Sequence, residues 1–256
     1  MMKNIINAIQ FLTVVTVGRK HVIEEGDLAK SMAYFPLVGF LIGVVLVYAD
    51  KAFTLIVLPQ TIGNLLLIVL SVLITRALHI DGLADTLDGI MGGNSKDSRL
   101  AIMKDSRIGT AGVLGIVFVL ILKYLCLNNL FNSEKIAALL TATMLSRWSQ
   151  TIMVFKASYG REEGMGKAFV GHLRASGLTA ASTVAIVLSA FVIIREETRT
   201  VFLIISLVVG VVLLTLSGRW YLVRKIGGVT GDSIGAVSEL NEALVLLLFV
   251  VFSGVS

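Results

Sequence analysis

The stretch Val201-Phe-Leu-Ile-Ile-Ser-Leu-Val-Val-Gly-Val-Val-Leu-Leu-Thr-Leu-Ser217 contains no charged residue and, as a helix, is long enough to cross the apolar part of a bilayer. Six further apolar runs suggest the same structure, although the second and the last are short: Leu37–Leu58, Asn64–Leu78, Ala111–Leu127, Ile136–Phe155, Leu178–Ile194 and Ala243–Phe252. The sequence therefore predicts an all-α fold, a polytopic integral membrane bundle of about seven transmembrane helices.

The composition excludes several other classes of protein. Charged residues make up 15% of the 256 positions and hydrophobic residues 56%, whereas about a quarter of a soluble domain is charged. The net charge of +5 does not indicate a nucleic-acid partner, because the basic residues are scattered between apolar runs. The single cysteine, Cys126, rules out a disulfide framework and a cysteine-rich metal site.

Basic residues are concentrated in alternate connections between the predicted spans. Sixteen of the 22 Lys and Arg residues fall in one set of connections, which includes all the long ones: His79–Gly109, Ala157–Gly177 and Gly218–Leu240. Because cytoplasmic loops retain Lys and Arg, we expect this set and the N-terminus to face the cytoplasm. The expected location is the cytoplasmic (inner) membrane of a bacterium or archaeon, with residues 1–18 as an interfacial helix and residues 1–256 as a single domain.

Three carboxylates follow the second span in the sequence His79-Ile-Asp81-Gly-Leu-Ala-Asp85-Thr-Leu-Asp88. On a helix, residues spaced i, i+4 and i+7 share one face. Mutual repulsion near a membrane favours a bound cation, and oxygen ligands suit Mg²⁺, with Mn²⁺ as a substitute. The simpler interpretation is a solvated helix end, and His79 is either part of the site or an interfacial histidine.

Further charged residues stand in the other segments that we expect to be cytoplasmic. Asp232, Glu239 and Glu242 are spaced to form one helical stripe that leads into the last span. Arg147 lies inside the fourth span and therefore needs an acidic or a phosphate partner. Glycines and cations of the kind that bind phosphate include Lys104, Arg107 and Arg161, although the positive-inside bias alone accounts for many such cations.

Several blocks of the sequence, taken together, resemble the cobalamin synthase family (adenosylcobinamide-GDP ribazoletransferase) over nearly the whole chain. The blocks, in the order of the family, are Ala8–Thr13, Tyr34–Gly39, His79–Gly89, Ile102–Gly109 and Gly228–Ala236. The resemblance implies a magnesium-dependent enzyme that joins adenosylcobinamide-GDP to α-ribazole, or its phosphate, and releases GMP. It also makes other enzymes of the pathway plausible partners, and a homo-oligomer is compatible with it.

The chemistry that the family implies assigns roles to eleven residues. In-line attack on a pyrophosphate requires positive charge around the phosphorus and a base for the attacking hydroxyl. The expected metal ligands are Asp81, Asp85, Asp88, Asp232 and Glu239, and the expected substrate contacts are His79, Lys104, Arg107, Arg147 and Arg161. Asp105 is the candidate for the base.

Two other functions use some of the same residues. Asp85-Thr-Leu-Asp88-Gly89 resembles the opening of the CDP-alcohol phosphotransferase motif, but the rest of that motif is missing. A cation transporter would also place carboxylates in a membrane, although transporters hold their ligands near the bilayer midplane and here the carboxylates are predicted at its boundary.

Overall fold

The computed structural model describes residues 2–17, 25–193 and 200–253, and the regular elements within these ranges are helices. The α-helices are α1 Met2–Leu12, α2 Glu25–Ser31, α3 Phe35–Leu55, α4 Gln60–Ile74, α5 Leu78–Gly92, α6 Lys96–Ile102, α7 Thr110–Asn128, α8 Asn132–Val154, α9 Ala175–Ile193, α10 Thr200–Ile226 and α11 Gly231–Ser253. Two short 3₁₀ helices, η1 Met32–Tyr34 and η2 Met165–Ala168, lie before α3 and before α9. The predicted all-α fold is confirmed.

Five helical segments in the described part of the chain are long and apolar enough to span a membrane. They are Gly26–Leu55, Thr110–Asn128, Ala175–Ile193, Val201–Ile226 and Gly231–Ser253, and α4 with α5 makes a sixth if the bent pair counts as one span. This number is roughly consistent with the prediction of about seven. The predicted fourth span corresponds to α8, whose polar side chains from Lys135 to Thr151 are buried among neighbouring helices.

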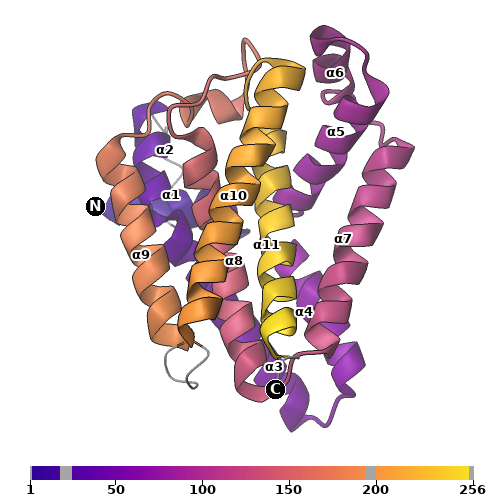
Figure 1. Ribbon diagram of the computed structural model, residues 1–256, viewed down its shortest axis with the longest axis vertical. Coiled ribbons are helices and arrows are strands. Elements are labelled where there is room, and N and C mark those ends of the chain that lie inside the picture. The colour runs from indigo at the N-terminus through magenta and orange to yellow at the C-terminus, as the bar shows by residue number, and fades with distance from the viewer. Residues whose placement is uncertain (1, 18–24, 194–199, 254–256) are drawn as a thin grey trace.

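The bundle is built around α8, which packs against α3 on one side and α11 on another. Figure 1 shows α9 and α10 to the left of α11, and α4, α5 and α7 to its right. The close contact of α3 with α8 depends on Gly39 and Gly43, because a Cβ at Gly43 would lie 2.8 Å from the backbone oxygen of Leu139. Small residues one turn apart thus allow the two backbones to meet.

The second predicted span, Asn64–Leu78, differs from the structure. Helix α4 ends at Ile74, the chain turns through Arg76 and Ala77 in the left-handed region (φ 53° and 57°), and α5 continues at an angle of 85°. The acidic residues after this turn lie on a helix, as their spacing predicted, but this helix packs against α7 and α11 at an angle to α4. Neither residue at the turn is Gly or Pro, so the sequence carries no ordinary signal for it.

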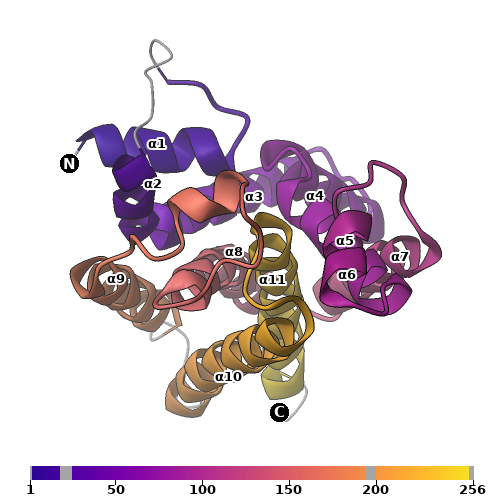
Figure 2. The same cartoon turned by 90° about the horizontal axis from the view of Figure 1, so that it is seen from above.

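The N-terminal segment forms a helix shorter than the predicted 1–18. Helix α1 buries Asn7, Ala8 and Leu12 and lies beside α2 at one edge of the bundle, crosswise to the long helices, as the view from above shows (Figure 2). Residues 1 and 18 are outside the described residues, as are four basic residues used to predict orientation: Arg19, Lys20, Arg195 and Arg199. The side of the membrane that each end of the bundle faces stays a prediction.

Candidate active site

Helix α5 meets the beginning of α11 at the end of the bundle where α6 also lies (Figure 1). Gly82 makes the contact close, because a Cβ at this position would be 2.5 Å from the backbone oxygen of Asp232. Thr230 and Ser233 cap α11 reciprocally, each side-chain oxygen accepting the backbone N–H of the other residue. The carboxylate of Asp232 is therefore not needed for capping and faces α5.

Three of the predicted metal ligands and one predicted substrate contact come together there. We call Asp81, Asp85, Asp232 and Arg161 the acidic mouth. Arg161 Nη2 lies 2.6 Å from Asp232 Oδ2, and Asp85 is within electrostatic reach of the other three residues. Because three carboxylates face one guanidinium, the group carries excess negative charge, and a bound cation would relieve the repulsion.

A backbone contact between two loops positions Arg161 at the acidic mouth. Gly160 N–H donates to Val229 O and Val229 N–H donates to Ser158 O, each at 2.9 Å. This isolated bridge ties the connection after α8 to the residues before α11. Gly228 permits the approach, because a Cβ there would overlap the carbonyl of Ser158.

A cavity of about 150 Å³ opens beside the mouth. Asp81 and Asp232 line one part of it, together with His79 and Gln150. The remaining lining is mainly apolar and includes the rings of Phe11, Phe35 and Phe169. The site thus combines an acidic entrance with an apolar interior.

A hydrogen-bond network fixes His79 and Gln150. The hydroxyl of Ser238 donates to Ser146 O at 3.0 Å, so it must accept from Gln150 Nε2 at 2.9 Å. The same amide nitrogen lies 2.7 Å from His79 Nε2, which therefore accepts as well. Neutral His79 then carries its proton on Nδ1, which is buried and has no partner among the described residues.

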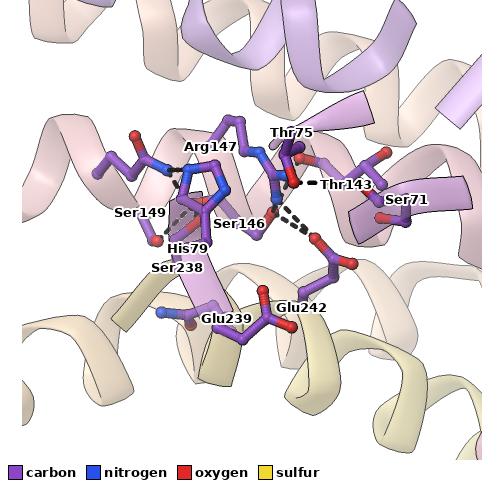
Figure 3. A network of polar contacts seen from close by, with 12 residues as sticks. Ser71, Thr75, His79, Thr143, Ser146, Arg147, Ser149, Ser238, Glu239 and Glu242 are labelled. Atoms are coloured by element: carbon purple, nitrogen blue, oxygen red, sulfur yellow. Dashed lines mark hydrogen bonds and ion pairs between the residues drawn. The ribbon is translucent and has the colours of Figure 1, made fainter. Parts of the chain in front are cut away.

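A second charged group lies deeper in the bundle and is drawn in part in Figure 3. We call Lys123, Arg147, Glu239 and Glu242 the buried charge cluster. Arg147 Nη1 donates to Glu242 Oε2 at 2.6 Å, and Lys123 pairs with both Glu239 and Glu242. Two cations balance two carboxylates, and all four residues are at most 5% exposed.

The buried charge cluster changes the interpretation of two predicted site residues. Arg147 finds the acidic partner that its depth requires, and Glu239 is held by Lys123. Neither residue lines the cavity beside the acidic mouth. The structure therefore does not bring them to Asp81 and Asp85, and the roles predicted for them toward metal and phosphate stay predictions.

Asp88 has a different environment from the two aspartates before it on α5. Its two carboxylate oxygens accept the backbone N–H groups of Gly109 and Gly112, at 2.7 and 2.8 Å. These groups belong to the first turn of α7, where a negative charge also suits the helix dipole. Asp88 thus caps α7 from a neighbouring helix, which leaves it less free to hold a metal.

Lys104, Asp105 and Arg107 lie in the connection between α6 and α7. Arg107 donates to both oxygens of Asp105, and this contact lowers the pKa of Asp105 to about 2. The Asp105–Arg107 pair lines a separate hollow beside Asp88, and Lys104 is exposed. The structure does not bring these residues to the acidic mouth.

Several residues of the site were not identified from the sequence. Gln150 and the three phenylalanines were indistinguishable from packing residues of an apolar span, and only tertiary contacts reveal them. Lys123 did carry a signal, because a lysine within the predicted span Ala111–Leu127 must find a buried partner.

The donor set of the acidic mouth fits a magnesium ion only in part. Among the described residues, no three His, Cys, Asp or Glu side chains are arranged closely enough to hold a metal. Magnesium, however, commonly takes one or two carboxylates and completes its shell with water and phosphate oxygens. Asp232 Oδ2 is buried and contacts Arg161 Nη2 at 2.6 Å, and because a carboxylate oxygen can accept more than one contact, it can also serve as a ligand to such an ion.

A bundle of apolar helices that carries an acidic cavity mouth at one end defines a polytopic membrane enzyme. The family described as Cobalamin-5-phosphate synthase matches residues 4–250. This chain belongs to that family, and the resemblance seen in its motifs is confirmed. The same match decides against the cation transporter and the CDP-alcohol phosphotransferase.

Curated relatives agree with this assignment. The adenosylcobinamide-GDP ribazoletransferase of Geotalea daltonii is 36% identical over 253 residues, which cover 96% of each chain. The enzymes of the same name from Fusobacterium nucleatum and Clostridioides difficile are 33% and 34% identical, covering 98% and 97% of each chain. No solved structure matches the chain.

Proposed function

We propose that this enzyme joins α-ribazole, or its phosphate, to adenosylcobinamide-GDP in a magnesium-dependent reaction. The products are adenosylcobalamin, or its phosphate, and GMP. The relatives named adenosylcobinamide-GDP ribazoletransferase, aligned over nearly the whole chain, support the choice of substrates. The convergence of Asp81, Asp85 and Asp232 beside Arg161 is the observation that carries the proposal.

The reaction exchanges a phosphoanhydride bond for a phosphate ester bond. A ribose hydroxyl oxygen of α-ribazole forms a bond to the phosphorus next to cobinamide, and the bond from that phosphorus to the GMP oxygen breaks. The proton of the hydroxyl passes to a carboxylate of the acidic mouth, and GMP leaves with the electron pair of the broken bond. Magnesium, when bound, neutralises charge on the phosphate oxygens.

Different residues of the acidic mouth would bind the metal and contact the phosphate. One or two of the carboxylates of Asp81, Asp85 and Asp232 would hold the metal together with water and phosphate oxygens, and Arg161 would contact a phosphate while it keeps Asp232 in position. Asp105 is a weak candidate for the base, because the neighbouring Arg107 keeps its pKa at about 2 and a good base titrates near the working pH.

We infer a cytoplasmic site in the inner membrane for this reaction. The mouth lies at the end of the bundle where α6 lies and α10 ends (Figure 1). These segments and the connection after α6 carry basic residues that include Lys96, Lys104 and Arg224. Cytoplasmic ends of membrane proteins retain such residues.

Release of GMP from adenosylcobinamide-GDP tests the function. The purified enzyme in detergent should release GMP only when both α-ribazole and Mg²⁺ are present. Asp85→Asn should lower the rate by about a hundredfold or more, because it removes a charge from the proposed metal site. Asp97→Asn, an exposed aspartate on α6, is the matched control and should retain the wild-type rate.

GMP release that needs neither α-ribazole nor a divalent ion would contradict the proposal. So would an Asp85→Asn enzyme that folds and turns over at the wild-type rate.

A further inference from the structure

The cavity beside the acidic mouth has an apolar part that the metal and phosphate chemistry does not use. Phe11 comes from α1, Phe35 from the start of α3 and Phe169 from the end of η2. Three distant segments of the chain therefore contribute aromatic rings to one cavity, and Met32 and Ile234 complete this part of its lining.

The three rings contact one another in a fixed arrangement. Phe11 stacks on Phe35 with centroids 5.9 Å apart, and Phe169 meets these two rings edge-on at 4.8 and 6.0 Å. Phe35 and Phe169 are 1% and 3% exposed, so they cannot swing away without disrupting the core. The partly exposed ring of Phe11 offers its surface to a flat aromatic ligand, and Phe35 and Phe169 hold that ring in place.

We propose that this apolar part of the cavity binds the aromatic base of α-ribazole, an inference that rests on the proposed function of the site. The base would lie against Phe11, which Phe35 and Phe169 hold in position, and the ribose would extend toward Asp81 and Asp232. A ribose hydroxyl would then stand at the acidic mouth, where the proposed function requires the nucleophile.

The size of the cavity limits which ligand can enter. Its volume is about 150 Å³, and apolar protein cavities of about that volume bind benzene. The cavity therefore encloses about one aromatic ring, the rest of a bicyclic base would lie at its opening, and a corrin ring is far too large. The cobinamide part of the other substrate must stay outside.

The chemistry of the lining favours binding of one of the two nucleoside bases in the reaction over the other. Guanine, the base of the GMP leaving group, carries N–H and carbonyl groups around its edge, and phenylalanine walls would leave several of these groups without partners. The base of α-ribazole is a methylated benzimidazole with a mostly apolar edge. The apolar lining accordingly favours α-ribazole.

The polar side chains that line the cavity, His79 and Gln150, are held in fixed positions. Gln150 is held between His79 and Ser238 by hydrogen bonds of 2.7 and 2.9 Å. Because these side chains are fixed, they do not collapse into the space, and the cavity is preformed for its ligand.

The test compares two substitutions of Phe11, which is half-buried, with one at a matched phenylalanine. Phe11→Leu removes the ring, Phe11→Tyr keeps it, and Phe53→Leu changes a half-buried phenylalanine near the other end of α3. The KM for each substrate is measured from GMP release in detergent. Binding of α-ribazole alone is measured by calorimetry, without Mg²⁺ or adenosylcobinamide-GDP.

We expect Phe11→Leu to raise the KM and the Kd for α-ribazole by about three- to tenfold, the usual worth of an aromatic contact, and to leave the KM for adenosylcobinamide-GDP unchanged. Phe11→Tyr should restore values near those of the wild type, and Phe53→Leu should change neither. An effect confined to the KM for adenosylcobinamide-GDP would overturn the proposal, as would unchanged α-ribazole values in Phe11→Leu.

The two proposals fail in different ways. If the wild-type enzyme binds α-ribazole and loses that binding in Phe11→Leu but releases no GMP, the proposed function is wrong and the cavity assignment holds. If the wild type releases GMP and Phe11→Leu has the wild-type KM for α-ribazole, the function holds and the cavity assignment is wrong.

Discussion

The acidic mouth and the buried charge cluster both take carboxylates from α11, yet they differ in charge balance. In the buried charge cluster, Lys123 and Arg147 neutralise Glu239 and Glu242, and all four side chains are almost completely buried. In the acidic mouth, Arg161 faces three carboxylates, and Asp81 is exposed. The first group is complete without a ligand, whereas the second is suited to receive positive charge from outside.

The largest expected effect is the loss of one partner from the buried charge cluster. Glu242→Gln leaves Lys123 and Arg147 buried with only Glu239 as a counter-charge, and we expect the free energy of unfolding to fall by about 3–5 kcal/mol. The measurement is denaturant unfolding in detergent micelles. An unfolding midpoint equal to that of the wild type would show that the cluster is not a structural unit.

A double substitution sharpens the same comparison. Lys123→Met together with Glu239→Gln removes one charge of each sign, so Arg147 and Glu242 remain as a balanced pair. This protein should be more stable than Glu242→Gln, because no uncompensated charge stays buried.

A smaller effect is expected from separating the two helices that form the acidic mouth. In Gly82→Ala, the new Cβ would lie 2.5 Å from Asp232 O, so α5 and α11 must move apart. Because displacement of catalytic groups by about 1 Å can cost a hundredfold in rate, we expect about that loss in GMP release. Gly92→Ala on the same helix meets only the end of Ile102 and should keep its activity.

The smallest expected effect is at Asp105. Arg107 lowers the pKa of Asp105 to about 2, so this carboxylate stays ionised at any pH at which the enzyme works. Asp105→Asn should therefore change kcat less than about threefold and leave the shape of its pH profile unchanged. A large loss of kcat together with loss of the acidic limb would instead identify Asp105 as the base that the sequence suggested.

Much of the helical architecture could be predicted from the sequence, because apolar runs are a local property of the chain. The bend between α4 and α5 could not, since Arg76 and Ala77 adopt left-handed conformations that neither residue favours. Helical spacing correctly placed Asp81, Asp85 and Asp88 on one helix. Helical spacing could not show that Asp88 has a different environment from Asp81 and Asp85, because the N–H groups that bind Asp88 come from the start of α7.

The same limit applies to α11. Asp232 and Glu239 are two turns apart and share a helical stripe, which predicted a common site. Each pairs with the nearest cation, and these cations, Arg161 and Lys123, come from segments remote in the chain. Tertiary neighbours, which periodicity does not reveal, therefore decide which carboxylate lies at the mouth.

The binding of Mn²⁺ tests most directly whether the acidic mouth holds a divalent ion. Electron paramagnetic resonance of the detergent-solubilised enzyme, titrated with Mn²⁺ in the presence of GMP, measures the bound ion. The account predicts one bound Mn²⁺ in the wild type and in Asp105→Asn, and loss of it in the double variant Asp85→Asn with Asp232→Asn. Equal Mn²⁺ binding by the folded double variant and the wild type would contradict it.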